Sequence, residues 1–357
     1  MSPYPMAPPM VIASQIRTSH TATFARQIPG REGAEPIVLI HGNLSSSVFF
    51  ERLMRLIPRR FRPIALDLRG FGGSDPEPVD ATRGVRDFAD DVLATLDALA
   101  IDSAHVVGWS LGGSVAMQAA IDAPERFVSM TLIAPISPYG FGGTVDAAGT
   151  LLAPDGAGSG AGLVSRALVR SLVDHDTSVE NRSGARALLR RFYTGDGWDG
   201  QGEDDLVAAM IATAVGPESY PGDVAESANW PGRAPGASGV MNAISPKYCD
   251  LSGFAGIDPK PPVLWIRGEK DCVISDESAM DIAVRGRGGS IDGYPGVDVA
   301  PPQPMLAQTR AVLDAYADGG GAVREVVIDG AGHAPHLTAL PQLLETLVPH
   351  LDGATGE

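Results

Sequence analysis

The sequence predicts an α/β fold, built on a mostly parallel, doubly wound sheet into which a helical segment is inserted. Two observations support this prediction. Short, continuously apolar runs alternate with helix-like runs along most of the chain, which is the pattern of βαβ units on a parallel sheet. The alternation stops near residue 137 and resumes near residue 256, with no strand-like run between. We therefore expect the intervening segment to lie outside the sheet.

The first half of the chain supplies strands and helices in strict alternation. A strand buried on both faces reads as an unbroken apolar run, whereas an amphipathic helix places apolar residues at helical spacing. Residues 1–20 begin Pro-rich, and we expect them to be a flexible lead. The elements expected after this lead are strands at 21–27, 36–40, 63–67, 105–107 and 130–134, and helices at 45–57, 86–100 and 114–121.

The second half contains the insertion and the remainder of the core. Residues 137–255 are irregular and rich in Gly, Ala, Ser and Pro, with helical candidates at 163–173, 183–193 and 204–215. The sheet pattern then resumes with strands at 262–268 and 323–328 and helices at 276–283, 305–316 and 337–351. We expect a core of residues 21–136 and 256–357, with 137–255 as a helical cap or lid.

The composition excludes several classes of protein. A net charge of −16 disfavours nucleic acid and anionic membranes as partners. The chain has no run of 18 apolar residues and no apolar core of signal-peptide type. Its two cysteines, Cys249 and Cys272, have no metal-ligand spacing and do not make a disulfide framework. We expect a reduced, cytoplasmic protein without a metal; the sequence leaves the oligomeric state open.

The most informative motif is Gly-x-Ser-x-Gly at Gly108, Ser110 and Gly112. It lies between a strand-like run and a helix-like run, where a sharp turn lifts the serine clear of the sheet. The turn also places the hydroxyl at a helix N-terminus, which favours developing negative charge. These features predict that Ser110 is a nucleophile.

A serine nucleophile needs a base and an orienting carboxylate, and both residue types follow later strands. A hydroxyl is activated by a histidine that a buried acid holds in place. Reactive groups in an open α/β sheet gather at the carboxyl ends of the strands. Asp271 and His333 each follow a predicted strand, so we expect them to complete a Ser–Asp–His triad. Asp276 and Asp329 are the competing acids, but the position of Asp276 is better suited to capping a helix.

The order Ser, Asp, His and its placement resemble the α/β-hydrolase superfamily. The resemblance covers about residues 35–136 and 260–350 and rests on His41-Gly42, the 67–75 loop, the Ser110 motif, Gly268-Glu269-Lys270-Asp271 and Gly330-Ala331-Gly332-His333. It implies the α/β-hydrolase fold, with a cap inserted after the sixth strand at 137–255. By this pattern, the backbone N–H groups of Asn43 and Leu111 form an oxyanion hole.

One part of the pattern points to another branch of the superfamily. The loop His41-Gly42-Asn43 with its following serines also resembles that of haloalkane dehalogenases, which use an aspartate nucleophile. Because the nucleophile position here is Ser110, dehalogenase and epoxide hydrolase chemistry are disfavoured. Trp109, His336 and Tyr294 are candidates for the pocket lining, although the first two are equally compatible with packing roles.

The function expected is that of a serine hydrolase acting on a small to medium carboxylic ester or lactone, without cofactor or metal. A carbon–carbon bond hydrolase of ring-cleavage products is the first alternative, and an amidase or acyltransferase is also compatible. The non-enzyme alternative is a catalytically silent receptor of the same fold. We expect the cap and the apolar loop 285–304 to roof a pocket for an uncharged or singly charged substrate. The acidic balance of the chain disfavours a polyanionic substrate.

Overall fold

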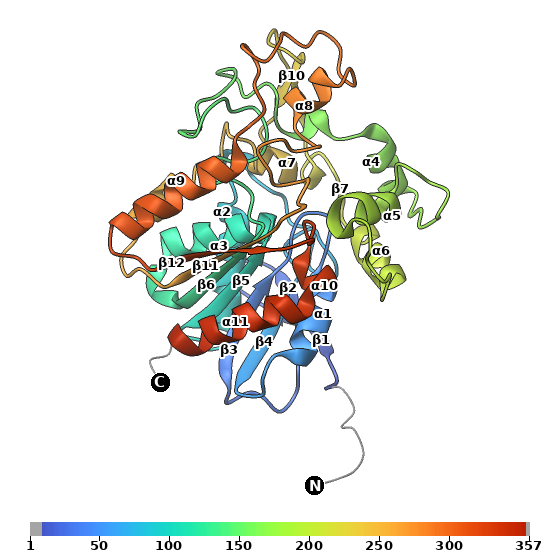
Figure 1. The fold of residues 1–357 in the computed structure, drawn as a ribbon. Coiled ribbons are helices and arrows are strands. Elements are labelled where there is room, and N and C mark those ends of the chain that lie inside the picture. Colours follow the sequence, from blue (N-terminus) through green and yellow to red (C-terminus); the bar gives the residue numbers. More distant parts are fainter. Residues whose placement is uncertain (1–8, 355–357) are drawn as a thin grey trace.

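The computed structural model describes residues 9–354, and within them the central element is an eight-stranded sheet. The strand order is β1-β2-β4-β3-β5-β6-β11-β12 (Figure 1). β1 and β2 are antiparallel to their neighbours, and the other six strands are mutually parallel. The strands are β1 (Ile12–Arg17), β2 (Ala22–Gln27), β3 (Glu35–Ile40), β4 (Phe61–Leu66), β5 (Ala104–Trp109), β6 (Phe127–Ile133), β11 (Val263–Gly268) and β12 (Val323–Ile328).

The seven strands expected from apolar runs are all present, but the start of the sheet differs from the expectation. Residues 12–17 form β1, so the assignment of 1–20 to a flexible lead is wrong for this stretch; residues 1–8 lie outside the described part. β1 is an edge strand whose side chains are mostly exposed. An exposed edge strand needs no apolar run, which is why the sequence pattern did not reveal it.

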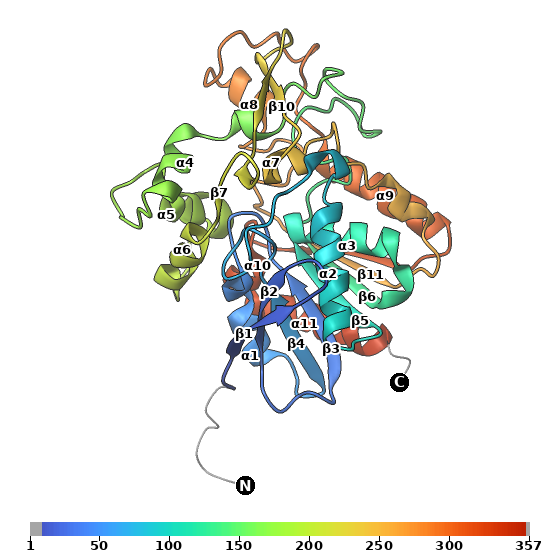
Figure 2. The ribbon, with the colours of Figure 1, turned by 180° about the vertical axis from the view of Figure 1, so that it is seen from behind.

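Helices cover both faces of the sheet. α1 and α11 lie on one face (Figure 1), and α2 and α3 lie on the other (Figure 2). α2 turns its apolar side inward, with Phe88, Val92 and Leu96 buried at helical spacing. The core helices are α1 (Glu51–Leu56), α2 (Arg86–Ala98), α3 (Leu111–Asp122), α9 (Met305–Asp318), α10 (Pro335–Thr338) and α11 (Leu340–Ala354).

Residues 137–255 leave the sheet after β6, the sixth strand, and lie above it in both views (Figures 1 and 2). Their helices are α4 (Arg166–Val173), α5 (Ala185–Leu188), α6 (Glu203–Ile211) and α7 (Val240–Ala243), with a π-helical turn at Leu189–Thr194. Four very short strands accompany the helices, namely β7 (Val215–Gly216), β8 (Tyr220–Pro221), β9 (Val224–Glu226) and β10 (Arg233–Pro235). The segment is therefore not the purely helical one that the sequence had suggested. Strands of two or three residues are too short to show a periodicity, so the sequence pattern did not reveal them.

The helix expected at 276–283 is displaced. α8 spans Ile282–Arg287, and the Asp281 carboxylate caps it by accepting hydrogen bonds from the N–H groups of Ala283 and Val284. α8 and the loop that follows it lie beside the inserted segment, above the sheet (Figure 1). The sequence pattern located a helix in this region but placed its start six residues too early.

Candidate active site

Ser110 lies in the turn that joins β5 to α3, near the middle of the sheet. Its backbone is in the positive-φ region, with φ 55° and ψ −117°. A non-glycine residue in such a conformation stores strain of the order of 1–3 kcal/mol, which the surrounding structure must offset. The turn places Ser110 at the end of the strand and at the start of the helix, as the motif predicted.

The two glycines of the motif are required by packing. A β-carbon at Gly108 would overlap the carbonyl oxygen of Gly112, and one at Gly112 would overlap the carbonyl oxygen of Ile40. The turn can therefore approach β3 only because both positions lack a side chain. The glycines set the position of Ser110 against the neighbouring strand.

Asp271 and His333 form a buried, hydrogen-bonded pair. The Nδ1–H of His333 donates to Oδ2 of Asp271 over 2.9 Å, and both side chains are almost fully buried. The other carboxylate oxygen, Oδ1, accepts from the N–H groups of Val273 and Ile274 over 2.8 and 3.0 Å. Because the backbone fixes the carboxylate, the histidine proton is held on Nδ1 and Nε2 is left as the basic nitrogen.

Ser110, His333 and Asn43 line one cavity of about 490 Å³ between the sheet and the inserted segment. Asp271 stands behind the histidine and does not line the cavity. A volume of this size accommodates a small to medium molecule. The rest of its wall is mainly apolar and includes Ile136, Phe141, Leu188, Phe192, Met241, Ile244, Val273 and Ile282.

Two backbone N–H groups lie next to the serine. Leu111 is the first residue of α3, so its N–H is among the amides that no carbonyl of the same helix accepts. Asn43 follows β3, and no acceptor for its N–H is present among residues 9–354. Both groups are therefore free to donate to an oxygen bound beside Ser110.

Residues of the inserted segment contact the loop that contains Asn43. The Tyr193 hydroxyl donates to the carbonyl oxygen of Asn43 over 2.6 Å, and the Asn43 side chain contacts the sulfur of Met241. The Tyr193 ring also packs edge-on against Trp109 and near His333, with centroid distances of 5.2 and 5.7 Å. Burial raises the pKa of this phenol, so it stays protonated and can act only as the donor to Asn43.

Sequence reasoning missed Tyr193. The residue falls at the end of a predicted helix in a segment whose wall residues could not be placed, and nothing in its neighbourhood indicates contact with Asn43. Its π-helical turn is the feature that brings it to the site. Such single turns are frequent at functional sites but have no clear sequence pattern.

The three residues expected to line the pocket do not line it. Trp109 is fully buried beneath the site, and its Nε1–H donates to the carbonyl oxygen of His333 over 2.9 Å. His336 packs between Trp109 and Phe50, and burial lowers its pKa to about 3, so it is a neutral packing residue. Tyr294 packs against another aromatic residue, Trp230, and its hydroxyl donates to the carbonyl oxygen of Ala300.

Asp276 does not compete for the histidine. Its Oδ1 accepts a hydrogen bond from the N–H of Leu306, in the first turn of α9, over 2.7 Å. It therefore caps a helix, but a helix distant in sequence rather than the one expected directly after it. His41 is also structural: its Nε2 accepts from the N–H of Leu68, and burial lowers its pKa.

Charged residues also lie along the cavity wall. Arg182, Arg191 and Arg285 line it, and none of the three has an ion pair within the described residues. Asp281 also lines it, but its carboxylate is occupied by the α8 cap and by the N–H of Gln303. The wall therefore offers three guanidinium groups without carboxylate partners.

Residues 9–354 contain no group of three or more His, Cys, Asp or Glu residues placed to hold a metal ion. No helix in that range is long and apolar enough to cross a membrane. Cys249 and Cys272 are both unpaired, and burial raises the pKa of the Cys249 thiol to about 12.

Comparison with known proteins places these features in context. The model of the alpha/beta hydrolase fold family matches residues 35–283. The chain is 35% identical over 111 residues to an uncharacterized carboxylesterase of Bacillus subtilis, covering 31% of this chain and 36% of that protein. It is 34% identical over 105 residues to a 2-hydroxy-6-oxo-6-phenylhexa-2,4-dienoate hydrolase of Comamonas testosteroni, covering 28% and 36%.

Solved structures extend the similarity to the whole chain. The carboxylesterase CesB of Bacillus subtilis superimposes with a TM-score of 0.58 at 17% identity, covering 97% of this chain and 93% of that one. The sequence matches are shorter, since they span only 28–40% of the length of the curated relatives. The shared fold thus extends well beyond the shared sequence.

Proposed function

The chain belongs to the alpha/beta hydrolase family, and on this premise we propose that it is a serine hydrolase that cleaves a carboxylic ester or lactone of small to medium size. The observation that carries the proposal is the pair formed by Asp271 and His333, in a cavity that His333 shares with Ser110. A strained serine at a helix N-terminus, a histidine with a fixed tautomer and free N–H donors are the parts that acyl transfer requires.

In the proposed reaction, Ser110 is the nucleophile and His333 the general base. The Ser110 Oγ attacks the carbonyl carbon of the substrate as Nε2 of His333 takes its proton. Asp271 keeps the ring oriented and stabilises the imidazolium that forms. The negative charge that develops on the carbonyl oxygen is stabilised by the N–H groups of Asn43 and Leu111.

The intermediate then collapses to an acyl-enzyme. The bond to the leaving alcohol breaks, and His333 returns the proton to the departing oxygen. A water molecule, deprotonated by the same histidine, attacks the acyl carbon; the bond to Ser110 Oγ then breaks, and His333 passes the proton to that oxygen as the acid is released. These reaction steps use only residues of this chain, the substrate and water.

We propose that residues 137–255, together with α8 and the following loop, form the cap over this site. The apolar wall of the cavity suits an apolar acyl or alcohol part. The loop reaches the cavity through Ser290, whereas Tyr294 ties it to the cap by packing on Trp230. With both cysteines unpaired, we also keep a reducing, cytoplasmic setting as part of the proposal.

The arginines of the cavity wall favour a second candidate, a carbon–carbon bond hydrolase. Arg182, Arg191 and Arg285 would attract a substrate with a carboxylate, because guanidinium groups bind carboxylates through paired hydrogen bonds. The Comamonas testosteroni relative is named as the hydrolase of a dienoate, which carries such a group. The same triad serves both reactions, so the choice between them rests on the substrate.

A substrate panel tests the proposal. The purified chain is assayed with p-nitrophenyl esters of increasing acyl length, with lactones and with a vinylogous diketone acid, beside Ser110→Ala. We expect ester or lactone turnover that falls by several orders of magnitude in the variant. Turnover of the diketone acid alone would favour the second candidate. Absence of turnover and of covalent labelling by a fluorophosphonate would favour a receptor without catalytic activity.

A further inference from the structure

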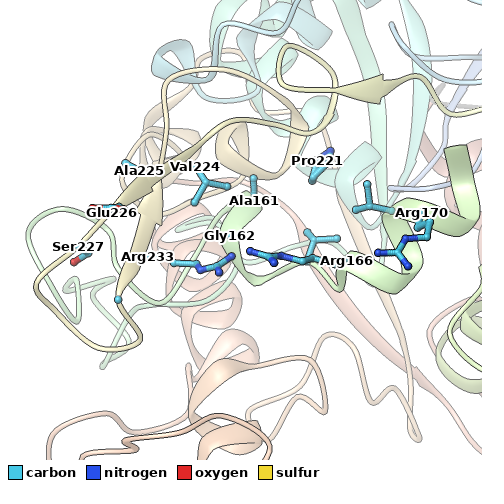
Figure 3. Close-up of a pocket in the computed structure, with 13 residues that line it drawn as sticks. Ala161, Gly162, Arg166, Arg170, Pro221, Val224, Ala225, Glu226, Ser227 and Arg233 are labelled. Atoms are coloured by element: carbon cyan, nitrogen blue, oxygen red, sulfur yellow. The ribbon is translucent and has the colours of Figure 1, made fainter.

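A second hollow lies on the inserted segment, next to the cavity that contains Ser110. It has a volume of about 700 Å³ and is bounded by the start of α4 on one side and by the β9–β10 hairpin on the other (Figure 3). Residues 160–165 separate the two hollows, and Val164 lines both of them. None of the residues assigned to acyl transfer lines this second hollow.

Three arginines converge on it. Arg166 and Arg233 point toward one another across the hollow, and Arg170 lies further along α4 (Figure 3). No ion pair or side-chain hydrogen bond of these three is present within residues 9–354. Glu226 is the one carboxylate among the lining residues, and it lies directly opposite Arg233 in the β9–β10 pair, next to Ser227 at the hairpin end. The hollow therefore keeps an excess of positive charge.

This local excess contrasts with the acidic balance of the chain, which carries 43 acidic and 27 basic residues. Within the described part of the chain, many of its other arginines lie in ion pairs, although the three in the wall of the Ser110 cavity do not. Arg69 pairs with Asp91, for example, and Arg310 pairs with Glu325. Three guanidinium groups with a single carboxylate among them repel one another, and this repulsion is relieved when an anion binds between them.

The backbone brings these three exposed arginines to the same hollow. Arg166 and Arg170 are four residues apart on α4 and so share one face of the helix. Arg233 belongs to β10, which pairs with β9, and its side chain runs over Gly162. A β-carbon at position 162 would lie 3.0 Å from Cβ and 3.2 Å from Cδ of Arg233. The glycine therefore allows Arg233 to lie flat along the floor of the hollow.

We propose that this hollow is a binding site for a small organic polyanion that carries at least two phosphate or carboxylate groups. Guanidinium groups form paired, charge-assisted hydrogen bonds with both kinds of oxyanion. The volume fits one small ligand, not an extended chain. Its apolar lining residues, including Val164, Val169 and Pro221, suit the carbon skeleton of such a molecule. The site is independent of the reaction proposed for Ser110.

Isothermal titration calorimetry with pyrophosphate and with citrate tests the proposal on the full chain in a low-salt buffer. We expect one site per chain for at least one of the two anions. Tighter binding of pyrophosphate would identify a phosphate ligand, and tighter binding of citrate a carboxylate ligand. Affinity should fall steeply as salt is raised. Ser110→Ala should bind as the parent does, which separates this site from the proposed reaction.

Matched variants decide whether the hollow is the site. The double variant R166Q/R233Q should bind at least tenfold more weakly, whereas R17Q/R324Q removes the same charge far from the hollow and should bind as the parent does. Gly162→Ala should weaken binding while keeping every charge. Thermal unfolding confirms that each variant is folded. Absence of binding by both anions, equal losses in the two double variants, or tighter binding of a poly-glutamate peptide than of either anion would overturn the proposal.

Discussion

The hydroxyl of Tyr193 donates a 2.6 Å hydrogen bond to the backbone carbonyl of Asn43. The bond joins the inserted segment to the loop after β3. The N–H of Asn43 in this loop is one of the two donors proposed for the oxyanion. Tyr193 also accepts, through its own carbonyl oxygen, a hydrogen bond from the N–H of Ala334, next to His333. One residue of the inserted segment thus contacts the loops on both sides of the proposed reaction centre.

Tyr193→Phe should therefore slow catalysis without removing any reacting group. We expect kcat to fall about five- to tenfold, the equivalent of one hydrogen bond, with little change in KM. The matched control is Tyr316→Phe, since the Tyr316 hydroxyl donates to the carbonyl oxygen of Pro261 over the same 2.6 Å, away from the site. If both variants lost stability alike and neither changed kcat, Tyr193 would have only a packing role.

The two candidate acids should differ sharply when each is made an amide. Asp271→Asn replaces the acceptor of the His333 proton, and we expect kcat to fall about 10³- to 10⁴-fold because the ring loses its tautomer. Asp276→Asn keeps an oxygen that can accept the hydrogen bond from Leu306, and asparagine caps helices about as well as aspartate, so both kcat and stability should change little. Steady-state kinetics and urea unfolding of both variants give the comparison. Similar kcat values for the two would place the acid elsewhere.

Gly112→Ala should destabilise the fold, although alanine normally favours a helix over glycine. The new β-carbon would overlap the carbonyl oxygen of Ile40 on β3, so we expect a loss of at least about 2 kcal/mol in the free energy of unfolding. Gly253→Ala is the control, because no heavy atom lies within 4 Å of its β-carbon position. A Gly112→Ala variant as stable as the control would mean that the turn adapts.

His336 should make the chain sensitive to acid. Its pKa is lowered from 6.5 to about 3 by burial. Between these values the unfolded chain binds a proton that the folded chain does not, so stability is lost as the pH falls below about 6.5. We expect His336→Phe, which can keep the contacts with Phe50 and Trp109, to reduce the loss between pH 7 and pH 5 by about 2 kcal/mol.

Urea unfolding at the two pH values measures that difference. His20→Gln, which changes an exposed histidine, should behave like the parent. An equal loss of stability in His336→Phe and the parent would assign the acid sensitivity to other groups.

The sequence predicted the parallel sheet well because its strands are buried on both faces and read as apolar runs. The Ser110 turn was equally predictable, since a β-carbon at position 108 or 112 would overlap the backbone and only glycine fits there. The sequence also placed Asp271 and His333 after two strands, β11 and β12, which lie side by side in the structure. These features are local in sequence or follow from the topology of a parallel sheet.

What the sequence did not reveal depends on contacts between distant segments. β1 is an exposed edge strand, and Asp276 caps a helix that begins about 30 residues later. Tyr193 reaches Asn43 only through the packing of the inserted segment on the core. Tyr294 was expected in the pocket as part of the apolar loop 285–304, but its ring packs on Trp230 instead. The spacing of apolar residues along the sequence does not indicate which distant residues come into contact.

The central claim is that Ser110 is the nucleophile, and covalent labelling tests it most directly. The purified chain is treated with a fluorophosphonate, digested, and analysed by mass spectrometry to locate the modified residue. We expect one phosphonyl adduct, on the peptide that contains Ser110, absent in Ser110→Ala and formed much more slowly in Asp271→Asn. An adduct on another residue, or undiminished labelling of Ser110→Ala, would contradict the claim.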